Sequence, residues 1–199
     1  MLRYLVEQRG WSGTVVKSLS TTMMVNRLAG KYGLPLRETP VGFNHIADLM
    51  LQEDVLIGGE ESGGISIKGH IPEGDGVLIG LLLLEIVAHA GVPLSELVAD
   101  LQRVAGPTCY IRDDLRLRHP VDKPKMVARL SQDPPASLAG VEVVEVATLD
   151  GVKYRLADQS WLLIRPSGTE PVLRVYAEAP DEPMVQELID FGRQIAATA

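Results

Sequence analysis

The sequence contains a single cysteine, Cys109, so it can form neither an intrachain disulfide nor a metal site built from several cysteines. It also lacks an excess of basic residues. The formal net charge is −7, and acidic residues outnumber basic ones in residues 1–106 and again in residues 107–199. This argues against a surface for nucleic acid or for an anionic membrane. We therefore expect any phosphate site to be a local arrangement of donors.

Long apolar runs are missing as well. The longest, residues 77–90, is interrupted by Glu85 and is too short to cross a bilayer. The first seven residues, MLRYLVE, lack the apolar core of a secretory signal peptide. These absences favour a cytoplasmic protein that has no membrane partner.

What remains is an ordinary globular composition, 46% hydrophobic and 23% charged over 199 residues, which suits one or two domains. The pattern changes after Gly106 and Pro107. We predict the α/β fold class: a mainly parallel α/β layered domain in residues 1–106, followed by a small α+β domain in residues 107–199 whose antiparallel sheet is covered by helices.

In the first half, short apolar runs alternate with helical patterns. Asp75 is a candidate N-cap for a long helix, and Ser95 is expected to start the next one. Extended segments are expected at residues 14–16, 34–39 and 54–58, and helices at residues 21–32 and 44–52. Helices between short buried strands indicate a mainly parallel sheet.

The second half is richer in strand patterns. Residues 110–112 and 115–117 alternate, a helix is expected at residues 121–130, and Asp181 is expected to cap a final helix. Asp150 and Gly151 form a strong hairpin signal. Consecutive antiparallel strands are expected at residues 141–147, 153–156, 161–165 and 172–178.

Residues 165–171, RPSGTEP, lie between two of these strands and carry several donors suited to a phosphate. The guanidinium of Arg165 offers a planar set of donors that matches phosphate oxygens. Ser167 and Thr169 add hydroxyls, and Gly168 lets the backbone turn so that successive N–H groups can point at one anion. The alternative is a polar hairpin turn in which Arg165 pairs with Glu170.

Residues 58–64, GGEESGG, follow an expected strand, and ligands of α/β sheets bind at the carboxyl ends of strands. The loop has no lysine and carries carboxylates, which would repel a nucleotide. Glu60 can accept hydrogen bonds from two neighbouring sugar hydroxyls, and Ser62 can donate or accept beside it. The alternative is a solvated glycine-rich turn.

Taken together, these motifs resemble the C-terminal part of the phosphoglucomutase/phosphomannomutase family, the α-D-phosphohexomutases. The resemblance covers roughly residues 14–178. Its landmarks stand in the family's order: residues 16–21 (VKSLST), 38–43 (ETPVGF), 59–64 (GEESGG), 70–76 (HIPEGDG) and 165–170 (RPSGTE).

The resemblance implies roles for the matching residues. Glu60 and Ser62 would hold the O3 and O4 hydroxyls of a hexose phosphate. Lys17 would lie close to the transferred phosphate, and His70 near the sugar loop, although the alternatives are a solvated strand-end lysine and a surface turn histidine. The phosphate that is not reacting would be gripped by Arg165, Ser167, Gly168 and Thr169.

One position departs from the family pattern. Many relatives carry lysine where this chain has Asn44, so a cation that contacts phosphate there is missing, and His45 is the neighbouring candidate replacement.

Two segments that the family's reaction needs are not found in the sequence. One is a phosphoserine loop, and the other is an acidic loop that holds Mg²⁺. Both lie in the family's N-terminal domains, so the chain is expected to be a piece that carries the third and fourth domains. Mg²⁺ would serve the full-length enzyme, hexose 1,6-bisphosphate would be its intermediate, and the chain alone would be inactive.

Three interpretations stay open. The chain is the substrate-specificity half of an enzyme acting on glucose or mannose phosphates, a fragment of a phosphoglucosamine mutase, or a non-catalytic module that binds sugar phosphates. Glu61 favours the first, because the resemblance implies glutamine at this position in the phosphoglucosamine branch.

Overall fold

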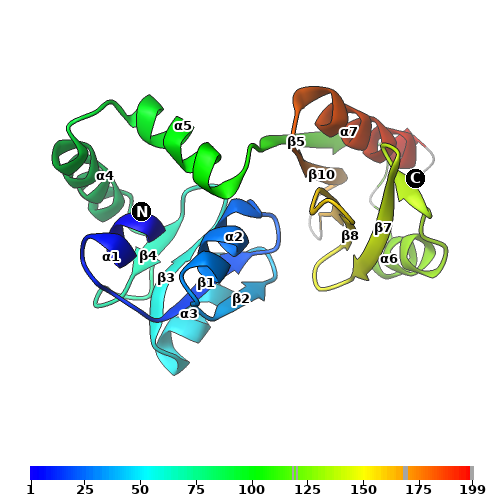
Figure 1. Cartoon of the computed structure of the whole chain (residues 1–199). Coiled ribbons are helices and arrows are strands. Elements are labelled where there is room, and N and C mark those ends of the chain that lie inside the picture. Colours follow the sequence, from blue (N-terminus) through cyan, green and yellow to red (C-terminus); the bar gives the residue numbers. More distant parts are fainter. Residues whose placement is uncertain (118, 120, 168–169, 198–199) are drawn as a thin grey trace. The chain divides into compact units, whose positions relative to one another are not determined.

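The computed structural model describes residues 1–117, 119, 121–167 and 170–197, and the chain forms two compact units, Met1–Gly106 and Pro107–Ala199 (Figure 1). The first unit combines a mainly parallel sheet with helices. The second contains an antiparallel sheet with helices. The predicted fold class is therefore confirmed.

The first unit is built on a four-stranded sheet in the order β2-β1-β3-β4, in which β1 runs parallel to β2 and β3 while β4 is antiparallel to β3. Its elements in chain order are α1 (Leu2–Glu7), β1 (Thr14–Ser18), α2 (Met24–Lys31), β2 (Leu36–Thr39), α3 (Phe43–Gln52), β3 (Val55–Gly59), β4 (Ile65–Ile67), α4 (Gly76–Ala90) and α5 (Leu94–Ala105).

Helices cover both faces of this sheet. Successive residues of a strand point to opposite faces, and Val15 and Val16 accordingly join different hydrophobic clusters. Val16 packs with Ile46 of α3. Val15 belongs to the cluster that contains Leu5 of α1 and Leu28 of α2, together with residues of α4 and α5. The result is a helix–sheet–helix arrangement.

The long helix α4 begins as its sequence predicts. The Asp75 carboxylate accepts hydrogen bonds from the backbone amides of Val77 and Leu78 at 2.9 and 3.0 Å, which satisfies amides that the helix itself leaves unpaired. The next helix, α5, begins at Leu94, directly after Pro93 and one residue before the predicted Ser95.

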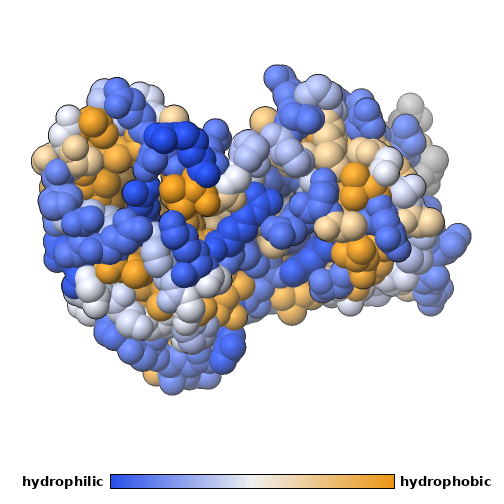
Figure 2. All heavy atoms as spheres, in the orientation of Figure 1, coloured by the Kyte–Doolittle hydropathy of each residue, from blue (hydrophilic) through white to orange (hydrophobic). Residues whose placement is uncertain are grey.

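Several large apolar side chains on α4 and α5 face outward. Figure 2 shows hydrophobic residues gathered over this region, and the exposed ones are Val77, Leu81, Leu84, Leu94, Val98 and Val104. In the part of the chain that the structure describes, no single helix is long and apolar enough to span a membrane, whereas α4 and α5 together, which meet at 84°, have sufficient length and composition.

The second unit contains a six-stranded antiparallel sheet in the order β5-β10-β9-β8-β7-β6. Residues 109–116 form one strand rather than the two short segments suggested by their alternation. The elements are β5 (Cys109–Arg116), α6 (Lys123–Gln132), β6 (Ser137–Leu138), β7 (Val141–Ala147), β8 (Val152–Leu156), β9 (Trp161–Pro166), β10 (Val172–Ala179) and α7 (Glu182–Ala197).

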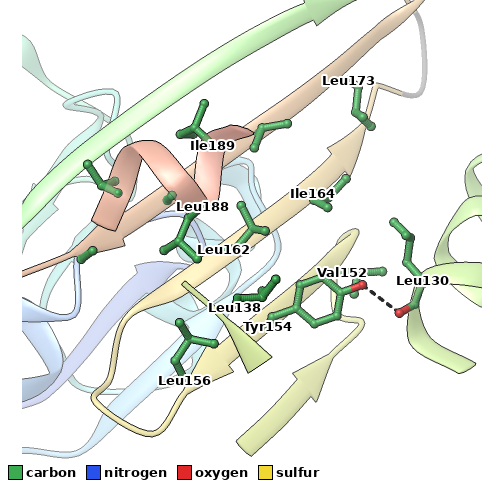
Figure 3. Packing of buried hydrophobic residues seen from close by; sticks show 14 of the residues in the cluster. Leu130, Leu138, Val152, Tyr154, Leu156, Leu162, Ile164, Leu173, Leu188 and Ile189 are labelled. Atoms are coloured by element: carbon green, nitrogen blue, oxygen red, sulfur yellow. Dashed lines mark hydrogen bonds between the residues drawn. The ribbon is translucent and has the colours of Figure 1, made fainter. Parts of the chain in front are cut away.

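Tyr154 belongs to the hydrophobic core of the second unit (Figure 3). Its side chain is fully buried, and its hydroxyl donates a hydrogen bond to the backbone carbonyl of Leu130, in α6, at 2.8 Å. Burial raises the pKa of Tyr154 to about 12. The hydroxyl therefore stays protonated at physiological pH and ties α6 to the sheet.

Replacing Tyr154 with phenylalanine is expected to destabilise the second unit by about 1–2 kcal/mol, because the buried carbonyl of Leu130 loses its donor. Residue-resolved amide hydrogen exchange on the buried strand residues Leu162 and Ile164 measures the change. Exchange of the first unit serves as the internal control. Unchanged protection of β9 would contradict a stabilising role for this hydrogen bond.

Candidate functional site

The loop between β3 and β4 closes on itself through two backbone hydrogen bonds. The amide of Glu60 donates to the carbonyl of Gly64 at 3.0 Å, and the amide of Gly63 donates to the carbonyl of Glu60 at 3.1 Å. Ser62 is exposed within this turn. The loop follows the carboxyl end of a strand in the parallel part of the sheet, the usual position for ligands in α/β folds.

The carboxylate of Glu60 is held against the beginning of α3. Its Oε1 accepts a hydrogen bond from the backbone amide of Gly42, the N-cap residue of α3, at 2.8 Å. The partial positive charge at a helix N-terminus favours a carboxylate there. Because a carboxylate has two oxygens, one can stay on Gly42 while the other accepts a hydrogen bond from a ligand hydroxyl.

Asn44 lies in the first turn of the same helix and is exposed, whereas His45 is partly buried. Asn44, which departs from the family pattern, thus lies two residues from the amide that holds Glu60. A neutral side chain stands where the resemblance implies a cation.

Glu61 anchors the other side of the loop. Its Oε2 accepts hydrogen bonds from the hydroxyls of Ser20 at 2.6 Å and Ser18 at 3.3 Å, and both serines are fully buried at the end of β1. Ser18 also lies 2.9 Å from the hydroxyl of Thr21. The sequence motif marks Glu61 only as a feature of the family branch, and it does not predict this contact with the two serines.

Lys17 is buried, with 1% of its side chain exposed. Its ammonium donates to the backbone carbonyls of Thr21 at 2.8 Å and Thr22 at 3.1 Å, and it lies 3.6 Å from Oε1 of Glu38. It is therefore not a solvated strand-end lysine. Its present contacts fix the segment after β1 against β2.

Lys17 and Glu60 line one cavity of about 220 Å³ in the first unit. Most of its lining is apolar and comes from residues such as Val25, Leu28 and Ile65. The polar groups that a hydrophilic ligand requires come from Arg3, Lys17, Thr21, Thr22 and Glu60, which also line this cavity.

His70 lies in the turn after β4 and faces the cap of α4. Its Nε2 is 3.1 Å from Oδ2 of Asp75, whose other oxygen caps the helix. The pKa of Asp75 lies below its ordinary value. The hydrogen bond from the amide of Leu78 lowers it most, and those from the amide of Val77 and from His70 lower it further, although burial opposes this. The His70 ring is 29% exposed, so a ligand can reach it.

In the second unit, Arg165 near the end of β9 is held by a carboxylate from the neighbouring turn. Its Nε donates to Oδ2 of Asp150 at 2.6 Å, and only 16% of its side chain is exposed. The alternative pairing with Glu170 is wrong, because Glu170 instead lies 3.6 Å from Arg174.

Asp150 also accepts a hydrogen bond from Nζ of Lys123 at 2.6 Å, through its Oδ1. Burial alone would raise the pKa of Asp150. The hydrogen bonds from Lys123 and Arg165 outweigh that effect and leave the pKa below its ordinary value. The sequence had marked Asp150 only as a hairpin residue and had given Lys123 no role.

Ser167 follows β9 directly. Its amide donates to the carbonyl of Val172 at 2.9 Å, and its hydroxyl accepts from the amide of Glu170 at 3.2 Å. These bonds close the turn that carries the predicted phosphate loop. Gly168 and Thr169, predicted for the same loop, lie outside the described residues.

The predicted residues therefore fall into two groups. Lys17, Glu60, Ser62 and His70 belong to the first unit, and Arg165 and Ser167 to the second. Among the residues that the structure describes, no three His, Cys, Asp or Glu side chains are grouped so that they could hold a metal ion. The described side chains thus supply no candidate ligand set for Mg²⁺.

Two family models match the chain. Residues 1–104 match the phosphoglucomutase/phosphomannomutase alpha/beta/alpha domain III, and residues 120–193 match the phosphoglucomutase/phosphomannomutase C-terminal domain.

Individual relatives agree with these matches. A phosphoglucomutase/phosphomannomutase of Thermococcus kodakarensis is 29% identical over 94% of this chain and 38% of its own length. A phosphoglucosamine mutase of Halorhodospira halophila is 35% identical over 94% of this chain and 37% of its own length. The chain therefore spans less than two fifths of the length of these relatives.

Among solved structures, a Thermus thermophilus protein assigned as a phosphomannomutase superposes with a TM-score of 0.78 at 34% identity. The match covers 98% of this chain and 39% of the other. Similarity in sequence and similarity in fold thus both point to phosphoglucomutase/phosphomannomutase proteins.

Proposed function

Because the chain belongs to the phosphoglucomutase/phosphomannomutase family, we propose that it is the substrate-specificity half of a phosphohexomutase. Such an enzyme interconverts hexose 1-phosphate and hexose 6-phosphate. The observation that carries the proposal is the loop of Glu60, which is closed by its own backbone and tied to Gly42.

In this proposal the sugar is held through two adjacent hydroxyls. Glu60 accepts hydrogen bonds from O3 and O4, and Ser62 adds a hydroxyl beside it. These hydroxyls occupy similar places when the sugar is turned so that C1 and C6 exchange. A receptor that contacts only O3 and O4 therefore accepts both orientations, which a mutase requires. Such a receptor also does not distinguish the two configurations at C2, because inverting the C2 hydroxyl would leave no buried group of the protein without its hydrogen-bond partner.

The phosphate that is not reacting is proposed to bind to Arg165 and Ser167, together with Gly168 and Thr169. Arg165 supplies a charge-assisted donor pair. His70, held by Asp75, would contact the ligand near the sugar loop. Lys17 would add positive charge to the site without contacting the ligand. Its ammonium donates hydrogen bonds to the carbonyls of Thr21 and Thr22, so its role would be to position that segment.

The chemical step is assigned to parts of the family that the match does not include. When bound, Mg²⁺ neutralises charge that develops on the transferred phosphoryl group, and hexose 1,6-bisphosphate is the proposed intermediate. We expect the complete enzyme to be cytoplasmic. The residues of this chain bind and orient the substrate for a phosphoserine elsewhere.

Two measurements test the proposal. A coupled assay for glucose 6-phosphate, with glucose 1-phosphate and Mg²⁺ supplied, is expected to show no turnover above background, because nucleophile and metal together supply most of the rate enhancement. Normal turnover would refute the proposal that the chemical step needs parts of the enzyme outside this chain.

Titration of the ¹⁵N-labelled chain with glucose 1-phosphate is expected to shift amides of residues 60–64 and Ser167 at millimolar ligand, and no shift at either loop would refute substrate binding.

A second candidate is a phosphoglucosamine mutase, favoured by several relatives with that name at 27–35% identity. The first proposal, in which no group contacts C2, predicts similar affinity for glucose 1-phosphate and glucosamine 1-phosphate, and titrations with both ligands test this. Binding at least several-fold tighter for the amino sugar would favour the phosphoglucosamine branch. Micromolar affinity for either ligand would instead favour a module that binds sugar phosphates without catalysis.

A further inference from the structure

The phosphate loop is supported by a buried carboxylate that the proposed function does not use. Asp150 lies in the turn between β7 and β8, and only 9% of its side chain is exposed. Each oxygen accepts a hydrogen bond from a different cation: Oδ2 from Arg165 and Oδ1 from Lys123, both at 2.6 Å. A carboxylate is rarely buried unless it is paired in this way.

The atoms used in these bonds determine which donors remain for a ligand. Arg165 is held through Nε, so its terminal nitrogens Nη1 and Nη2 can form the planar pair that matches two phosphate oxygens. Lys123 has three ammonium protons and is 37% exposed. It can therefore bind Asp150 and a phosphate oxygen at the same time.

The charges of the three groups lead to the same conclusion. Two cations around one carboxylate leave a local charge of about +1 in a chain whose net charge is −7. A bound phosphate would place a second negative group on the two cations, opposite the carboxylate of Asp150. Both cations are already drawn together by the oxygens of one side chain, so little reorganisation is needed when the anion binds.

Resting on the proposed function, we infer that Asp150 is a positioning residue of the phosphate site and that Lys123 is a second cation contacting the phosphate. Asp150 orients Arg165 through Nε and holds Lys123 beside it. In this proposal two cations from different elements, Arg165 of β9 and Lys123 of α6, bind the phosphate together with the loop.

Substitution of Asp150 separates positioning from simple charge. Asp150→Asn removes a negative charge next to an anion site, so unspecific electrostatics would strengthen phosphate binding. Positioning predicts the opposite sign, because Arg165 and Lys123 lose their shared anchor. We expect the dissociation constant for inorganic phosphate to rise about tenfold, even though a repulsive charge is gone.

The experiment titrates inorganic phosphate and glucose 1-phosphate into the ¹⁵N-labelled full chain and three variants, Asp150→Asn, Lys123→Gln and Lys125→Gln. The amide of Ser167 and the Nε–H of Arg165 are followed. Lys125 is the matched control, since it carries the same charge on α6, is 86% exposed and pairs with Asp122. Lys123→Gln is expected to weaken phosphate binding about fivefold or more and Lys125→Gln less than about twofold.

Each result has a distinct meaning. Equal or tighter binding by Asp150→Asn, with wild-type binding intact, overturns the positioning role alone. Equal losses for Lys123→Gln and Lys125→Gln overturn the direct contact of Lys123. A wild-type chain that shows a protected Arg165 Nε–H but no response to either ligand overturns the phosphate site itself, and the proposed function with it. Retained amide dispersion identifies variants that remain folded, and Lys123→Arg, which keeps the charge, is expected to retain most of the affinity.

Discussion

Replacing Lys17 with methionine is expected to destabilise the first unit by about 3–5 kcal/mol. The substitution removes an ammonium that is 1% exposed and leaves the carbonyls of Thr21 and Thr22 and the carboxylate of Glu38 without this partner. Buried polar groups that lose a partner keep their full desolvation cost. Amide hydrogen exchange of the buried residues Val16 and Leu56 measures the loss, while exchange of the second unit serves as the reference.

Lys68→Met is the matched control for this variant. Lys68 lies in the same unit and forms a 2.7 Å ion pair with Asp54, but 42% of its side chain is exposed. Solvent-exposed pairs contribute little, so its loss is expected to cost at most about 1 kcal/mol. Similar small effects for both lysines would show that the buried network does not support the fold.

Gly151→Ala is expected to destabilise the second unit by about 2–5 kcal/mol. The backbone at Gly151 has φ of +98°, which side chains other than glycine rarely adopt. A Cβ would also lie 2.5 Å from the carbonyl oxygen of Ile164 and 3.0 Å from Cα of Arg165. Because β9 must move to relieve this overlap, phosphate binding at Arg165 is expected to weaken as well. Hydrogen exchange at Leu162 and the phosphate titration measure the two effects.

Gly140→Ala separates backbone strain from overlap. Gly140 has φ of +76° in the same unit, but a Cβ there would meet no atom within 4 Å. The cost is expected to be about 1–2 kcal/mol from the positive φ alone, with unchanged phosphate affinity. Equal losses for the two alanine variants would show that the close approach of Gly151 to β9 is unimportant.

The sequence predicted the larger elements because their patterns are local. The apolar stripe of α4 and the cap at Asp75 both lie within one segment, so both could be predicted. β4 was missed because Ile65–Ile67 is too short for an alternating pattern and follows a run of glycines. β5 was divided in two because Asp113 and Asp114 interrupt its apolar residues, although antiparallel pairing with β10 continues through them.

The candidate site shows the same limit at the level of single contacts. The donor types in residues 165–171 suggested a phosphate loop, yet nothing local indicates which carboxylate holds Arg165. That partner is determined by the register of β8 and β9, in which Val152 pairs with Ile164 and so brings the preceding turn beside Arg165. Glu61 likewise depends on serines 41 and 43 residues earlier in the chain. Such contacts follow from tertiary structure.

The pairing of β5 with β10 also bears on how the chain folds as it is synthesised. β5 is the first strand of its sheet to leave the ribosome, whereas β10, which separates it from the other strands, comes after all of them. The hairpins of β7, β8 and β9 can assemble early, but the sheet stays incomplete until β10 emerges. Until then the nascent β5 has an unpaired backbone edge, and this interval is when chaperone protection would matter most.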